Sequence, residues 1–230
     1  MMLPKGYGKT TLTDTRLAFD LDGTVTMREL LPTLAEELGL SREITHLTRL
    51  AMDGGIDFAA SFQLRFAMLR TLPLTTVHRI ADAIPLDPHM AAFIKRHSGH
   101  CAIVTGNLDV WIEPIVAKLG CAVYSSRSIT RDGKLEIARI MDKAEAVQDM
   151  ARTGARVVAI GDAANDIPMF KAAHIAIAYA GLRKLPQALI NVTDRVEDDP
   201  AALCWLLQEL LCAKNEENPF QSGKKAPFTA

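Results

Sequence analysis

The sequence lacks an excess of charge of either sign. Its 26 basic and 27 acidic residues give a formal net charge of −1, and the isoelectric point is near 6.6. Domains dedicated to nucleic acids usually carry a strongly basic face. The balanced charge therefore predicts a protein with no nucleic-acid partner.

Long apolar runs are also missing. No stretch approaches the roughly 18 residues that a bilayer-spanning helix needs, and the first residues lack the apolar region of a secretory signal. We therefore expect a cytoplasmic protein with no membrane partner. The early segment GYGKTT is not a complete P-loop, because Leu3 stands where that motif requires its first glycine.

Closely paired cysteines are absent as well. The four cysteines form no C-x-x-C pair: Cys101, Cys121, Cys204 and Cys212. The histidines show no metal-ligand spacing. This pattern predicts reduced thiols that act as small apolar side chains, with neither a zinc site nor a disulfide framework.

Apolar residues make up 49% of the 230 residues, enough for a packed core. A short apolar run at 16–21 predicts a buried strand. Residues 27–85 then carry apolar positions at helical spacing, and from residue 87 strand and helix patterns alternate. One helix, at 108–120, is expected to kink or begin late because of Pro114.

These patterns predict an α/β fold, a Rossmann-like parallel sheet core interrupted after its first strand by a small helical-bundle cap. The core would comprise residues 14–26 and 86–212, and the cap residues 27–85. Residues 213–230 are polar and contain Pro and Gly, so we expect a disordered tail.

Three predicted strands end in polar residues: Asp20 and Asp22; Thr105, Gly106 and Asn107; Asp162, Asn165 and Asp166. A single Asp after a strand is usually a turn residue or a helix cap. In open parallel sheets, however, the carboxyl ends of the strands meet at one edge, where ligands bind. Several carboxylates gathered there need a counter-charge, and Mg²⁺ is the cation that suits oxygen ligands.

Asp20 and Asp22 lie two residues apart, so on an extended segment they face the same side. Asp20 could attack phosphorus as a nucleophile, and Asp22 could protonate the leaving oxygen and later activate water. Lys143 is a candidate cation for the transferring phosphoryl group. Thr105 and the backbone of Gly106 are candidate hydrogen-bond donors.

The ordered set of D-L-D-G-T at 20–24, IVTGN at 103–107, Lys143 and GDAAND at 161–166 resembles the haloacid dehalogenase superfamily of phosphatases. The resemblance implies a nucleophilic Asp20 and an acid/base Asp22. It also implies Mg²⁺ held by Asp20, Asp162 and the main-chain carbonyl of Asp22. Asn165 and Asp166 would support the metal and phosphate site.

Within that superfamily the chain is most similar to phosphoserine phosphatases. Glu29 and the segment AMDGGIDFAASFQLR match their pattern, which implies that Glu29 binds the substrate ammonium and Arg65 its carboxylate. Met52 and Phe58 would line the pocket. The alternatives are a helix first-turn acid for Glu29, a solvent-facing charge for Arg65, and ordinary core positions for Met52 and Phe58.

The match has departures. Thr105-Gly106-Asn107 stands where Ser-Gly-Gly is usual, which puts the Asn107 side chain near the phosphoester, and GDAAND stands where GDGAND is commoner. We expect Gly106, Asn107 and Asn165 to contact the substrate.

The predicted function is a Mg²⁺-dependent phosphomonoesterase that works through an aspartyl phosphate, acting on O-phosphoserine or a similar small phosphorylated amino acid, in serine biosynthesis. One alternative is the same chemistry on another small phosphate ester, or phosphoryl transfer to an acceptor alcohol. Another is a catalytically idle regulator that binds phosphorylated ligands. The sequence leaves the oligomeric state open.

Overall fold

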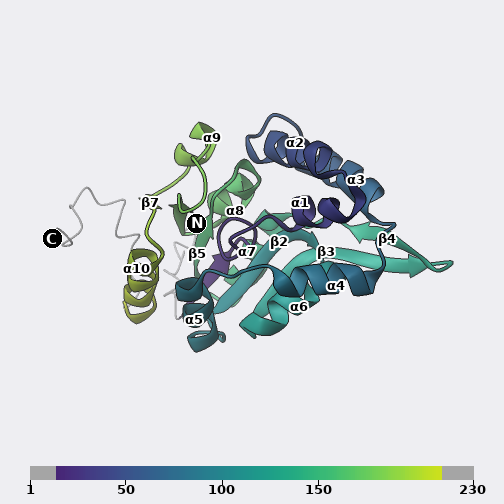
Figure 1. Ribbon diagram of the computed structural model, residues 1–230. Helices are drawn as coiled ribbons and strands as arrows, with labels where there is room; N and C mark the ends of the chain where they lie inside the picture. Colours follow the sequence, from purple (N-terminus) through teal and green to yellow (C-terminus); the bar gives the residue numbers. More distant parts are fainter. Residues whose placement is uncertain (1–13, 214–230) are drawn as a thin grey trace, which may run out of the picture.

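A seven-stranded sheet runs through the centre of the protein in the computed structural model, which describes residues 14–213 (Figure 1). The GYGKTT segment and residues 214–230 of the predicted tail lie outside this range. The strand order is β4-β3-β2-β1-β5-β6-β7, and every pair is parallel except β3 and β4. The strands are β1 (Thr15–Phe19), β2 (Cys101–Leu108), β3 (Ala122–Arg131), β4 (Lys134–Arg139), β5 (Arg156–Gly161), β6 (Ile175–Tyr179) and β7 (Arg195–Glu197).

The first strand lies in the middle of the sheet. Leu17 pairs with Cys101 of β2 on one side and with Val158 of β5 on the other. Because all three strands run in the same direction, their carboxyl ends meet at one edge. The three polar strand ends of the sequence therefore converge, as predicted.

The strand residues alternate between two cores. Leu17 and Phe19 belong to one apolar cluster, whereas Ala18 between them belongs to the cluster on the opposite face. Alternate side chains of a strand point to opposite faces, so a sheet buried on both sides reads as a continuous apolar run.

Helices cover both faces of this sheet. The first cluster packs against helices on one face, including α5, α6 and α10, and the second against α7, α8 and α9 on the other (Figure 1). No helix within residues 14–213 has the length and apolar character needed to cross a bilayer. The helices are α1 (Leu30–Ala35), α2 (Ser41–Met52), α3 (Phe58–Leu69), α4 (Leu74–Ala83), α5 (Pro88–Arg96), α6 (Asp109–Leu119), α7 (Lys143–Ala151), α8 (Ile167–Ala172), α9 (Gln187–Ile190) and α10 (Pro200–Cys212), with 3₁₀ turns η1 (Glu36–Leu38) and η2 (Ala164–Asp166).

Helices α1 to α4 form the insertion after β1, which confirms the predicted fold class. Its two ends meet, because Met27 N donates to Pro85 O at 2.8 Å and Asp87 N donates to Val25 O at 2.9 Å. This closure supports the division into a core (14–26 and 86–212) and a cap (27–85), which stays a prediction.

Two details differ from expectation. Helix α6 begins at Asp109 and continues through Pro114, so the late start is wrong. The short elements α9 and β7 were not predicted, since four and three residues are too few to establish a periodicity.

Candidate active site

Lys143 joins two of the predicted acidic residues. Its Nζ lies 2.5 Å from Asp20 Oδ1 and 2.6 Å from Asp166 Oδ1, and all three side chains are buried. Lys143 is the first residue of α7, so the helix start delivers its side chain to the ends of β1 and β5. The cation thus holds the candidate nucleophile in place.

Asp166 is fixed by the backbone as well. Its Oδ2 accepts hydrogen bonds from Asp162 N at 2.9 Å and Ala163 N at 3.0 Å. A Cβ on Gly161 would lie 2.4 Å from that oxygen, so the glycine of the GDAAND motif leaves room for the carboxylate. The side chain is therefore rigidly positioned at the tip of β5.

Asp162 is the third acidic residue of the site. Neither of its side-chain oxygens makes a hydrogen bond with any described residue, although both are buried. Asp20, Asp162 and Asp166 each offer one oxygen, and these oxygens lie within 4.8 Å of one another. Buried carboxylate oxygens that make no hydrogen bond suit a hard divalent cation, so the donor set fits Mg²⁺.

The pKa values of these groups reflect the excess of buried carboxylates over cations in the site. Burial, followed by the charge of Asp166, raises the pKa of Asp20 to about 7 even though Lys143 opposes the shift. Burial, followed by the charges of Asp20 and Asp166, raises the pKa of Asp162 well above its usual range. Lys143 stays protonated, because the two carboxylates outweigh burial and raise its pKa. Without a further cation, the site disfavours full ionisation of its carboxylates.

Asp22 lies outside this trio and has different partners. Its Oδ2 accepts a hydrogen bond from Asn107 Nδ2 at 2.7 Å, and its Oδ1 accepts one from Leu30 N at 3.1 Å. Burial raises the pKa of Asp22, and the hydrogen bond from Asn107 works against that shift. Two buried carboxylates of one strand end thus have separate environments, which suits separate chemical roles.

The end of β2 supplies hydroxyl and amide groups next to Asp22. Thr105 Oγ1 accepts from the backbone N and from Nδ2 of Asn107, each at 3.2 Å. Gly106 lies under the ring of Phe58, since a Cβ at position 106 would be 2.1 Å from Phe58 Cζ. The cap and the core are therefore in close contact over the candidate nucleophile.

A small cavity remains between them. Its free volume is about 20 Å³, room for about one water molecule. Nearly all of the predicted catalytic and substrate-binding residues line it: Asp20, Asp22, Glu29, Met52, Phe58, Arg65, Thr105, Gly106, Asn107 and Asn165, together with Leu31 and Phe62. The structure is therefore a closed state.

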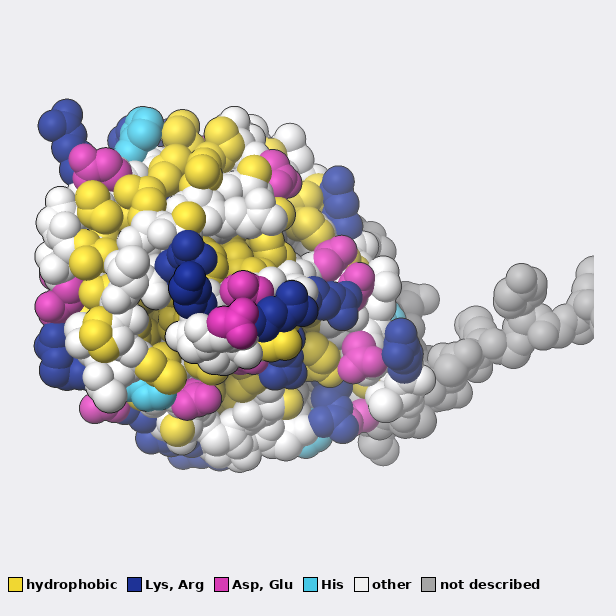
Figure 2. All heavy atoms as spheres, turned by 90° about the vertical axis from the view of Figure 1, so that its right-hand side faces the viewer, with side chains coloured by type: hydrophobic (Ala, Val, Ile, Leu, Met, Phe, Trp, Pro, Cys, Tyr) yellow, Lys and Arg dark blue, Asp and Glu magenta, His cyan; other side chains and the backbone are white. Residues whose placement is uncertain are grey.

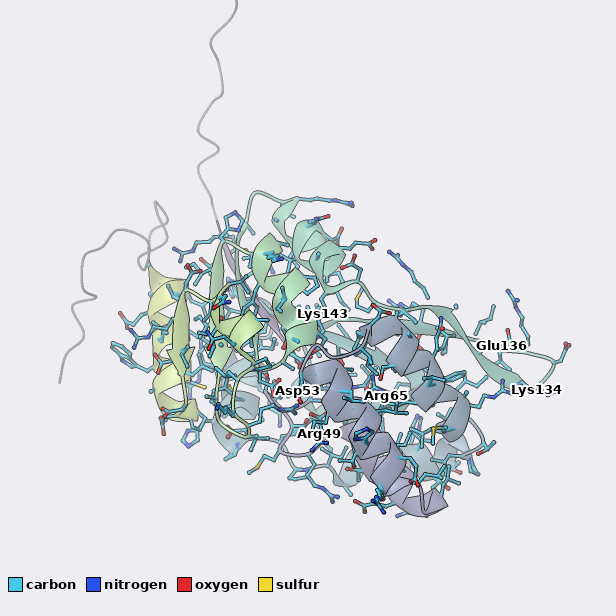
Figure 3. All side chains as sticks on the ribbon, turned by 90° about the horizontal axis from the view of Figure 1, so that it is seen from above. Arg49, Asp53, Arg65, Lys134, Glu136 and Lys143 are labelled. Atoms are coloured by element: carbon cyan, nitrogen blue, oxygen red, sulfur yellow. The ribbon has the colours of Figure 1, made fainter. Side chains whose placement is uncertain are left out.

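Arg65 is the buried cation of this cavity. Its side chain is 2% exposed, so the solvent-facing alternative is wrong. Nε donates to Ser61 O and Nη1 to Thr48 Oγ1, whereas Nη2 has no hydrogen-bond partner among the described residues. The guanidinium lies 5.6 Å from the centroid of Phe58, and Figure 3 shows it between α2 and α3. A buried guanidinium with a free N–H is suited to bind a carboxylate.

Glu29 lies just before α1 and does not cap it with its side chain. Its Oε1 is in direct contact with Nη2 of Arg183. The same guanidinium lies beside Asp162, with Arg183 Nε 2.6 Å from Asp162 Oδ2. The contact with Asp162 lacks hydrogen-bond alignment and is an ion pair only. Sequence reasoning missed Arg183, because a lone cation in the irregular segment GLRKLP gives no periodic or motif signal.

The predicted residues thus gather in one buried site, with Asp166, Asp162 and Lys143 beneath the cavity and Arg65 and Glu29 on the cap side. Met52 is buried and Phe58 is half-buried, and both line the cavity as well as contributing to packing. The roles of the individual residues stay predictions. Chemically, the arrangement combines a nucleophile, a possible metal site, and cations for an anionic substrate.

Comparison with known proteins gives the family. The family model of haloacid dehalogenase-like hydrolases matches residues 17–171. A phosphoserine phosphatase of Methanocaldococcus jannaschii is 32% identical over 177 residues, which cover 71% of this chain and 84% of the relative. A phosphoserine phosphatase of Mycobacterium tuberculosis is 33% identical over 202 residues, which cover 80% of this chain but 49% of that longer relative.

Solved structures agree. A phospho-aspartyl intermediate analogue of phosphoserine phosphatase superposes with a TM-score of 0.72 at 28% identity, covering 86% of this chain and 99% of the other. A substrate-bound phosphoserine phosphatase superposes with a TM-score of 0.73 at 28% identity, covering 85% and 97%. The chain belongs to the haloacid dehalogenase-like hydrolase family.

Proposed function

We propose that this chain hydrolyses O-phosphoserine, or a similarly small phosphorylated amino acid, to the free alcohol and inorganic phosphate. The observation that carries the proposal is the junction of Asp20, Lys143 and Asp166 beneath a closed cavity that also holds Arg65. The names of the similar proteins support the same substrate. The cytoplasmic location and the small phosphorylated partner belong to this proposal.

The chemistry follows from the positions of two aspartates. The Asp20 carboxylate attacks phosphorus, the bond from phosphorus to the serine oxygen breaks, and Asp22 gives its proton to that oxygen. Water then attacks the aspartyl phosphate after giving a proton to Asp22, which returns both residues to their starting state. Lys143 and Thr105 bind the phosphoryl oxygens.

Asp20, Asp162, Asp166 and the main-chain carbonyl of Asp22 are the groups that would hold Mg²⁺. When bound, this ion would offset the charge of the carboxylates and of the phosphoryl oxygens. Arg65 would fix the substrate carboxylate with Nη2, which has no hydrogen-bond partner within residues 14–213.

A panel of phosphate monoesters, assayed with Mg²⁺ and with excess EDTA, tests the proposal. We expect phosphate release from phosphoserine that requires Mg²⁺ and exceeds release from sugar phosphates. Release from sugar phosphates but not from phosphoserine would contradict the substrate, and no release from any ester would favour a regulatory role.

A further inference from the structure

Arg183 contacts both the cap-side acid Glu29 and the core acid Asp162. It lies in the segment after β6, far from Glu29 in the sequence. The Arg183 side chain is 27% exposed and Glu29 is 20% exposed, whereas the neighbouring pair of Arg28 and Glu36 is 52% and 55% exposed. The contact is therefore well shielded from solvent, where an ion pair is stronger than on an open surface.

The backbone makes room for this contact. Gly23 has φ +82°, a conformation that favours glycine, and a Cβ there would lie 2.8 Å from Arg183 Nη2 and 2.4 Å from Asp162 Oδ2. The guanidinium reaches Glu29 from a groove of about 580 Å³ outside the closed cavity, and Glu29 lines both spaces. Arg183 can thus stay on Glu29 while a ligand occupies the cavity.

A guanidinium in contact with Glu29 changes what that carboxylate can do. If Glu29 alone were to bind a substrate ammonium, it would have to carry an uncompensated negative charge. Here the guanidinium already supplies the positive partner, so an ammonium group gains less from binding beside it. Nη2 of Arg65, which bonds to no residue in the described part of the chain, still favours a carboxylate.

The charges of the whole site point the same way. Lys143 and Arg65 also face the acidic groups of the site. Burial lowers the pKa of Arg183, but the charges of Asp20 and Asp22 oppose that shift, so Arg183 stays charged. With Asp22 protonated, as the leaving-group step requires, the ionised carboxylates are Asp20, Glu29, Asp162 and Asp166. Lys143, Arg65, Arg183 and a divalent cation then leave the site with one positive charge, whereas without Arg183 the site would be neutral.

We propose that Arg183 is a specificity-determining residue. It makes this site accept, besides phosphoserine, small phosphate monoesters that carry a carboxylate but no ammonium group. This inference rests on the proposed function, since it concerns the substrates of the same site. The deamino analogue of phosphoserine, 3-phosphooxypropanoate, is such an ester and carries one more negative charge than phosphoserine.

The test measures binding rather than turnover. Isothermal titration calorimetry with Mg²⁺ on the Asp20→Asn variant, which lacks the nucleophile, gives the Kd of both esters. We expect the two Kd values to be similar. Adding Arg183→Gln should shift their ratio at least about fivefold in favour of phosphoserine, and a smaller shift would overturn the inference.

Matched variants separate charge from structure. Arg28→Gln removes a cation from the same groove that pairs with Glu36 instead, so the ratio should not move. Arg183→Lys keeps the charge and should hold the original ratio. If Arg183→Gln does not fold, Glu29→Gln replaces it in the test. This variant should change the ratio of the two Kd values by less than about fivefold, and a larger shift against phosphoserine would overturn the inference.

Turnover by the unmodified chain reports separately on the proposed function. If no ester is hydrolysed but the binding ratio responds to Arg183, only the hydrolase proposal fails. If phosphoserine is hydrolysed and the ratio does not respond, only this inference fails.

Discussion

Asp20 and Asp22 are separated by one residue, yet the contacts around them differ. Lys143 bonds to Asp20, whereas Asn107 and a backbone amide bond to Asp22. A carboxylate beside a lysine at the metal trio is suited to attack, and a carboxyl in a separate hydrogen-bonded niche is suited to carry a proton. The division of labour therefore follows from neighbours rather than from residue type.

Replacing Asp20 by Asn tests the nucleophile. We expect kcat for phosphoserine to fall by about a thousandfold or more, because an amide is a poor nucleophile. Phosphate release reports the loss, and circular dichroism melting checks that the variant still folds. Turnover that survives in a folded Asp20→Asn protein would mean that another group attacks phosphorus.

Arg65→Lys tests the carboxylate contact while retaining a buried positive charge. A lysine ammonium lacks the planar fork by which Arg65 bonds to Ser61 and Thr48 and still presents Nη2, so KM for phosphoserine should rise about tenfold or more. An aryl phosphate has no carboxylate to lose, and its kcat/KM should change little. Equal losses on both substrates would contradict the assigned role.

Among the elements, α4 and α6 show how the insertion is tied to the core. Pro114 has no N–H, so the carbonyl of Val110, four residues earlier, loses its partner inside α6. His78 of α4 fills the gap, with Nε2 2.7 Å from Val110 O. Lys118 of α6 also pairs with Asp82 at the end of α4, at 2.8 Å. A proline that removes one hydrogen bond within α6 thus leaves a carbonyl to which α4 binds.

A double-mutant cycle checks this link. In urea unfolding, His78→Ala should lower the free energy of unfolding by about 1 kcal/mol. In the Pro114→Ala background the loss should be smaller, because the new N–H bonds to Val110 O. Glu113→Gln controls for the ion pair between His78 and Glu113 at 3.7 Å. Identical losses in both backgrounds would show that the carbonyl does not couple the two helices.

For the molecule as a whole, the main feature is the contact between cap and core over the cavity. With room for about one water, the closed state cannot admit a phosphorylated amino acid. The α2–α3 half of the insertion has to move for a substrate to reach Asp20, while α4 keeps its contacts with α6.

Figure 2 shows a different side of the molecule, where charged side chains of both signs surround the projecting β3–β4 hairpin, which includes Arg131 and Glu136.

A reversible crosslink would test this opening. A Cβ at Gly54 would lie 3.3 Å from Ala164 Cβ, close to the roughly 3.5–4.5 Å of a disulfide. We expect the Gly54→Cys, Ala164→Cys protein to lose most turnover when oxidised and to regain it on reduction. Cys212 is exposed and should be replaced by Ser in every variant.

Gly54 has φ +77°, where a side chain costs about 1–2 kcal/mol, so Gly54→Cys alone is the necessary control for strain. That single variant should keep turnover in both redox states. Full turnover in the crosslinked protein would rule out opening at this contact.

The sequence by itself determined the parts that depend on local chemistry. A short apolar run at 16–21 predicted the first strand, and helical spacing predicted the helices of the insertion. The aspartates, Lys143 and Arg65 could be named from residue type, spacing and the family resemblance. The tertiary structure alone decided which charges meet. Arg183 and Glu29 are 154 positions apart, and their contact depends on how the loop after β6 returns over the end of β1. Patterns of neighbouring residues do not predict such a contact, because an ion pair forms wherever the fold places opposite charges close together.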